Sequence, residues 1–96
     1  PFAGVRAAVT RQDEAGEPAG GWNPDQRLSV KEAVGLYTEG GAYASFEERR
    51  KGALAPGMLA DLAVPDRDIF SVLPDEIPGT RSLLTMMGGR FTHREI

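Results

Sequence analysis

The sequence predicts an α+β fold in which helices come first and strands follow. Two observations carry this prediction. Apolar residues recur at helical spacing in two segments of the first half of the chain. After Gly52 that spacing is lost, and residues 80–94 have the pattern of two strands around a Gly-Gly pair, which is typical of a β-hairpin.

The first predicted helix covers residues 2–11, because its apolar residues lie at positions i, i+3 and i+7. These residues are Phe2, Val5 and Val9. Residues 12–27 are rich in Gly and Pro and have little periodicity, so a long loop follows. Trp22 in this loop either covers a substrate pocket or anchors the loop, and we favour the anchor.

The second predicted helix begins at a capping box, Ser29-Val30-Lys31-Glu32. The Ser29 hydroxyl can accept a hydrogen bond from the Glu32 amide, and the Glu32 carboxylate can accept one from the Ser29 amide. Glycine tolerates the left-handed conformation that closes many helices, so we expect this helix to end before Gly40-Gly41. A short helical turn is predicted over residues 42–46.

The second half of the chain is predicted to be mainly strand. Pro56-Gly57 favours a type II turn, since Pro sets φ at the first central position and Gly supplies a positive φ at the second. The apolar run Leu59–Val64 predicts a strand buried on both faces, and Pro65 either ends this strand or places it at the edge of a sheet.

Two further elements are expected toward the C-terminus. Pro74–Ile77 suits one helical turn with Pro at its start. Thr80–Met87 and Arg90–Arg94 should form the hairpin, with Gly88-Gly89 as its turn.

No set of residues in the chain matches a catalytic or metal-binding pattern. His93 is the only histidine, and one imidazole cannot build a hydrolytic metal site. Asp66-Arg67-Asp68 is expected to be a polar turn, and Asp75-Glu76 lacks the spacing of a calcium loop. The four serines lack a nucleophile motif and a histidine partner. They are Ser29, Ser45, Ser71 and Ser82.

The residues singled out for a role are therefore structural. Asp61 lies within an apolar run, where a carboxylate needs hydrogen-bond donors. We expect it to accept backbone amides from the Pro56-Gly57 turn and to hold that loop. Gly57, Gly88 and Gly89 are expected to supply the positive φ angles of the two turns.

Composition excludes several functional classes. The net charge of −3 and the mixed signs of Glu47–Lys51 do not favour nucleic-acid binding, which needs clustered Lys and Arg. No apolar run reaches the roughly 20 residues that span a bilayer. The absence of cysteine fits a reducing compartment, and we expect the cytoplasm.

The stretch Lys51–Val64 resembles the K-G-x-L-x-P-G-x-x-A-D-L-x-V signature near the C-terminus of metal-dependent amidohydrolases. Four further segments resemble the amidohydrolase family 3 group, which includes N-substituted formamide deformylases, in the same order along the chain. They are Pro1–Arg11, Pro24–Ala33, Thr38–Ala44 and Leu83–Arg90. Pro65 and His93 depart from the family pattern, which has an aliphatic residue at the first position and commonly Tyr at the second.

The resemblance implies a metal-dependent hydrolase with a (β/α)₈ barrel that cleaves C–N bonds of amides and related groups. Residues 1–50 would be barrel-closing helices with a long loop. Residues 51–96 would be C-terminal strands of a small composite β-sandwich, ending in the hairpin and pairing with strands from a missing N-terminal part. The family's metal ligands have no counterpart in this chain, so zinc or another divalent metal would be held by that missing part.

These implications predict an inactive C-terminal fragment of such an enzyme, which fits a chain that begins at Pro1 without an initiator Met. The alternative is a free-standing, non-enzymatic binding or assembly module. Without the strands of the N-terminal part, the sheet should keep open edges and an uncovered apolar face that includes Leu62, Val64, Leu84 and Met86. The helices should also lose the sheet that they cover, which would expose Val5, Val9, Val34 and Tyr37. We therefore expect a symmetric homo-oligomer, most simply a two-fold dimer in which helices of one copy cover strands of another.

Overall fold

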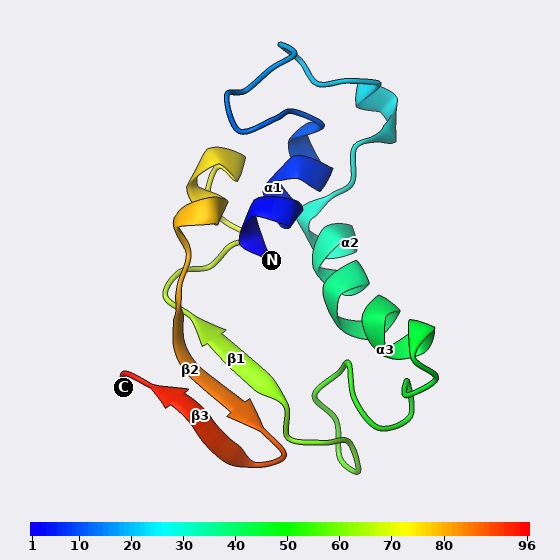
Figure 1. Cartoon of the computed structure of the whole chain (residues 1–96), viewed down its shortest axis with the longest axis vertical. Coiled ribbons are helices and arrows are strands. Elements are labelled where there is room, and N and C mark those ends of the chain that lie inside the picture. Colours follow the sequence, from blue (N-terminus) through cyan, green and yellow to red (C-terminus); the bar gives the residue numbers. More distant parts are fainter. The chain divides into compact units, whose positions relative to one another are not determined.

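The computed structural model describes all 96 residues and shows a small α+β chain. Its helical segments are α1 (Phe2–Thr10), η1 (Pro24–Gln26), α2 (Val30–Gly35), η2 (Leu36–Gly40), α3 (Gly41–Ala44) and η3 (Pro74–Gly79), and its strands are β1 (Leu62–Pro65), β2 (Ser82–Met87) and β3 (Arg90–Arg94) (Figure 1). The chain divides into two compact units that interleave in sequence. The first comprises Pro1–Val34 and Asp68–Thr80, and the second comprises Gly35–Arg67 and Arg81–Ile96.

The first unit has a hydrophobic core of its own, built where α1 meets η3. Val5 on α1 is 2% exposed and Ile77 on η3 is fully buried, and Ile69 and Ala33 complete the cluster. The expectation that Val5, Val9 and Val34 lack cover was therefore wrong. Residues 69–77, which sequence periodicity did not mark as core, fold back onto the helices and cover them.

The loop after α1 is held to the end of that helix by Trp22. The backbone N–H of Trp22 donates to the Arg11 carbonyl (2.8 Å), and Arg11 Nε donates to the Trp22 carbonyl (2.9 Å). The Arg11 guanidinium also lies 4.9 Å from the centre of the indole ring. Trp22 thus anchors the loop, as we favoured, while its side chain stays exposed.

The capping box is present as predicted. Ser29 Oγ accepts the Glu32 amide and Glu32 Oε1 accepts the Ser29 amide, both at 3.0 Å. The backbone hydrogen bond from Ser29 and the Ser29 side chain lower the pKa of Glu32.

The predicted end of this helix was wrong, because helical backbone continues through Gly40 and Gly41. Their φ angles are −64° and −63°, and η2, a π-helical stretch, runs directly into α3. Glycine permits a left-handed cap but does not impose one. The helix instead ends at Ala44, and Phe46, two residues later, has the left-handed conformation with φ +61°. The Glu47 amide donates to the Ala42 carbonyl (2.8 Å), so the last turn closes in a Schellman-type arrangement.

The second unit contains a three-stranded antiparallel sheet in the order β1-β2-β3. The predicted hairpin is confirmed: Met87 pairs with Arg90, and Gly88 and Gly89 have φ of +58° and +80°. Two positive values in a row are the pattern of a type I′ turn, which matches the twist of the flanking strands.

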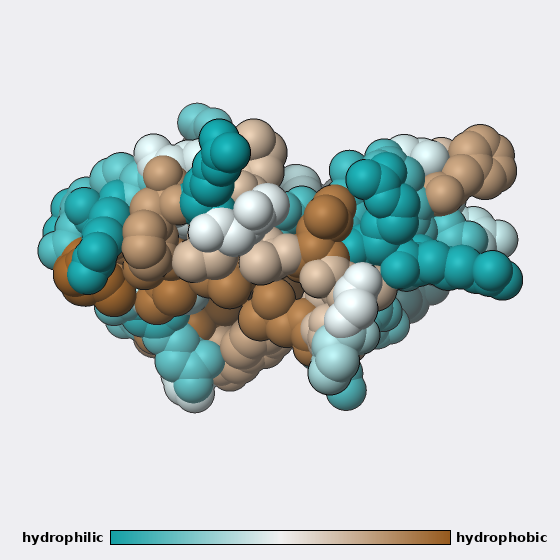
Figure 2. Space-filling model, turned by 90° about the horizontal axis from the view of Figure 1, so that it is seen from below, coloured by the Kyte–Doolittle hydropathy of each residue, from teal (hydrophilic) through white to brown (hydrophobic).

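Strand β1 is shorter and more exposed than predicted. It covers Leu62–Pro65 instead of Leu59–Val64, and Ala63 and Val64 are exposed, so burial on both faces was wrong. A sheet of three short strands offers too little cover for both faces. Figure 2 shows apolar residues, in brown, at the molecular surface.

The α+β class is confirmed, whereas the division at residue 50 stays a prediction. None of the helices has the length and hydropathy that a membrane span requires.

Candidate functional site

The amidohydrolase-like stretch Lys51–Val64 forms the loop that enters β1, and it makes three distinct backbone arrangements. The first is the predicted turn at Pro56-Gly57. Gly57 has φ +88°, and the Met58 amide donates to the Ala55 carbonyl (3.1 Å). A positive φ after Pro is the pattern of a type II turn.

The second arrangement joins the loop to the hairpin turn. Asp61 Oδ1 accepts the Gly88 amide at 2.7 Å, and the Ala60 carbonyl accepts the Gly89 amide at 3.1 Å. Asp61 thus accepts a backbone amide, but the expected donors in the Pro56-Gly57 turn were wrong. The donor belongs to a segment far along the chain, which local spacing could not identify. The side chain is half-buried rather than enclosed.

The third arrangement involves Gly52, which the sequence reasoning missed. Its φ is +101°, and a Cβ added there would lie 2.9 Å from Ala42 Cβ and 3.1 Å from the Thr38 carbonyl oxygen. The loop backbone therefore passes so close to the helical segment 36–44 that only glycine fits without a shift. The Gly that follows Lys51 in the signature was the available signal.

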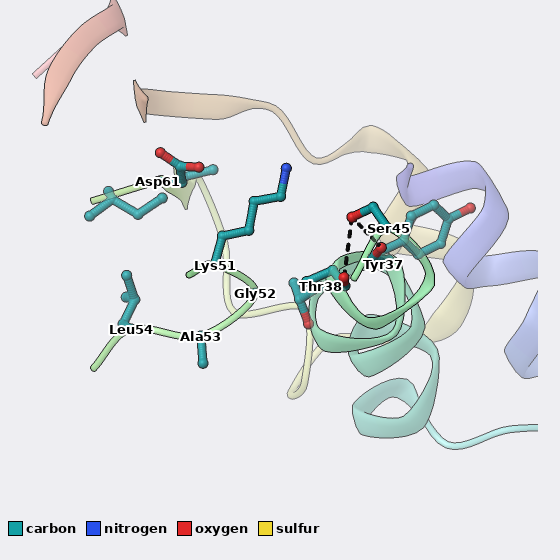
Figure 3. A pocket seen from close by; sticks show the side chains of 12 residues that line it. Tyr37, Thr38, Ser45, Lys51, Gly52, Ala53, Leu54 and Asp61 are labelled. Atoms are coloured by element: carbon teal, nitrogen blue, oxygen red, sulfur yellow. Dashed lines mark hydrogen bonds between the residues drawn. The ribbon is translucent and has the colours of Figure 1, made fainter. Parts of the chain in front are cut away.

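A pocket of about 550 Å³ lies between this loop, the helical segment and the start of β1 (Figure 3). Its lining residues all belong to the second unit: Tyr37, Thr38, Gly41, Ala42, Ser45, Lys51, Gly52, Ala53, Leu54, Asp61, Leu62 and Ala63.

The chemistry of this pocket is limited. Lys51 and Asp61 are its charged residues. Lys51 Nζ pairs with Glu47 Oε1 at 3.2 Å, and hydrogen bonding and attraction from Lys51 lower the pKa of Glu47. The Ser45 hydroxyl is hydrogen-bonded to helix carbonyls at 3.2 and 3.4 Å (Figure 3), and a hydrogen bond from Ser45 also contributes to the lowered pKa of Glu47. The pocket therefore offers a mostly apolar surface, and its lining contains no histidine or cysteine.

The acidic segment after β1 is a polar turn, as predicted. Asp66 pairs with Arg67 at 3.0 Å and with Arg81 at 3.7 Å. The hydrogen bond from Arg67 is the main cause that lowers the pKa of Asp66. Asp68 accepts the Phe70 amide (3.0 Å) and the Ser71 hydroxyl (2.8 Å), so its carboxylate serves the local backbone.

The remaining candidates are dispersed. His93 is exposed on β3, and its Nε2 lies 3.1 Å from Glu95 Oε1. Asp75 pairs with Arg6 at 3.0 Å in the first unit. No group of three or more His, Cys, Asp or Glu side chains is arranged to hold a metal ion.

The model of the protein family described as "Amidohydrolase family" matches residues 1–93. The chain belongs to this family. It is 30% identical over 95 residues to the amidohydrolase YtcJ of Bacillus subtilis (strain 168), covering 99% of this chain and 18% of that protein. It is 33% identical over 82 residues to the N-substituted formamide deformylase of Arthrobacter pascens, covering 85% of this chain and 15% of that protein.

A plant protein, LONG AFTER FAR-RED 3 of Arabidopsis thaliana, is 29% identical over 90 residues, which are 94% of this chain and 15% of that protein. The chain thus spans less than a fifth of the length of each of these curated relatives. No solved structure matches the chain.

Proposed function

We propose that these residues are the C-terminal part of a metal-dependent hydrolase that acts on non-peptide, amide-type C–N bonds. The observation that carries the proposal is the family match over residues 1–93, and it is supported by a relative named as a formamide deformylase. Family membership supports this type of enzyme, and the chain covers less than a fifth of each of these two relatives.

The proposed architecture follows the family. Residues 1–50 would close a (β/α)₈ barrel, and residues 51–96 would add strands to a small composite β-sandwich. The mixed α and β character supports this assignment, as does a three-stranded sheet whose strands β1 and β3 each have one unpaired edge. The partner of this part would be the N-terminal part of the same enzyme.

The residues present do not fit a catalytic metal. Metal hydrolases hold zinc with three protein ligands or more, and the titratable side chains here do not converge in such a group. Zinc or another divalent ion would therefore be bound by the rest of the enzyme. We assign no catalytic step to this chain, whose role would be structural and centred on Gly57, Asp61, Gly88 and Gly89.

Two measurements test the proposal. The purified 96-residue chain, dialysed after incubation with zinc, should hold less than one ion per chain and should not hydrolyse a panel of formamides and simple amides. The coding sequence upstream of Pro1 should continue in frame into a histidine-containing barrel, and the extended protein should bind metal and hydrolyse members of the panel. One tightly bound ion per chain, or an extended protein without amidase activity, would contradict the proposal.

A free-standing binding or assembly module is the second candidate. The observation that favours it is the core of the first unit, where Ile77 is fully buried by residues of this chain. A start codon directly before Pro1, together with cooperative unfolding of a compact monomer, would favour the module over the fragment.

A further inference from the structure

We draw no further inference here: the strongest candidate, the mostly apolar pocket of about 550 Å³ between the loop Lys51–Val64, the helical segment 36–44 and the start of β1, carries nothing because no observation shows what covers it, and the chain spans less than a fifth of each curated relative.

Discussion

Replacing Gly52 by alanine should destabilise the second unit more than the same change at Gly57, although both glycines lie in the signature loop. Both have positive φ, at +101° and +88°. A Cβ at Gly52 would approach Ala42 Cβ to 2.9 Å and the backbone of residues 38–39 to 3.1–3.2 Å, whereas a Cβ at Gly57 would meet nothing within 4 Å. The two substitutions therefore share the conformational cost and differ in the steric contact.

The magnitudes follow from these two terms. Placing an L-residue at positive φ costs roughly 1–2 kcal/mol, which is the whole effect expected for Gly57→Ala. Forcing a methyl group into a packed contact adds roughly 1–3 kcal/mol, because helical backbone cannot move aside as a flexible side chain can. Gly52→Ala should therefore cost about 2–5 kcal/mol. This is a large part of the roughly 5–15 kcal/mol that stabilises a typical domain.

Urea unfolding followed by far-UV circular dichroism gives both values. Trp22 belongs to the other unit, so its fluorescence provides a separate reading of that unit. Adding Ala42→Gly to Gly52→Ala removes the nearest contact and should recover part of the loss. Equal losses for Gly52→Ala and Gly57→Ala would show that the loop does not pass as close to the helical segment as the structure describes.

Three other changes have defined outcomes. Asp61→Ala should lower the free energy of unfolding in urea by about 1 kcal/mol, because the Gly88 amide of the hairpin turn loses a charged acceptor. Asp61→Asn retains an acceptor oxygen and should lower it less; equal unfolding midpoints for both variants and the unmodified chain would contradict this hydrogen bond. Thr80 is 8% exposed and its hydroxyl has no hydrogen-bond partner, so Thr80→Val should raise the free energy of unfolding by about 1 kcal/mol. A lower urea midpoint for Thr80→Val would show that the hydroxyl does form a hydrogen bond. Hydrogen bonds from Ser29 lower the pKa of Glu32 in the folded state, so the stabilisation by Glu32 is present above its unfolded-state pKa and is lost as pH falls through its folded-state pKa. Glu32→Gln should reduce the loss of unfolding free energy at acid pH, and an unchanged dependence of stability on pH would contradict this role.

What the sequence predicted well depends on neighbours along the chain. The capping box joins residues three positions apart, and the Gly88-Gly89 hairpin joins strands through two residues, so each carries its own geometric requirement. The first helix was predicted to within one residue for the same reason.

The errors arose where a distant segment decides the outcome. Ile77 is the most buried residue of the first unit, yet it lies in a short Pro-bounded turn with no helical or strand period around it. The donor to Asp61 is 27 residues away. The prediction that the helix ends before Gly40 and Gly41 was wrong for another reason. Glycine makes a helix end less costly, but the hydrogen bonds of the following residues continue the helix to Ala44.

The same distinction explains how a loop without catalytic chemistry can identify a hydrolase family. Its informative residues are those for which the backbone has few alternatives. Gly52 allows the close approach to the helical segment, Gly57 turns the chain, and the Asp61 carboxylate accepts the Gly88 amide of the hairpin turn. Each requirement is met by one or a few residue types, and together they fix where β1 starts relative to β2 and β3. A loop of this kind specifies a scaffold through geometry, while the chemistry that the scaffold supports depends on residues elsewhere.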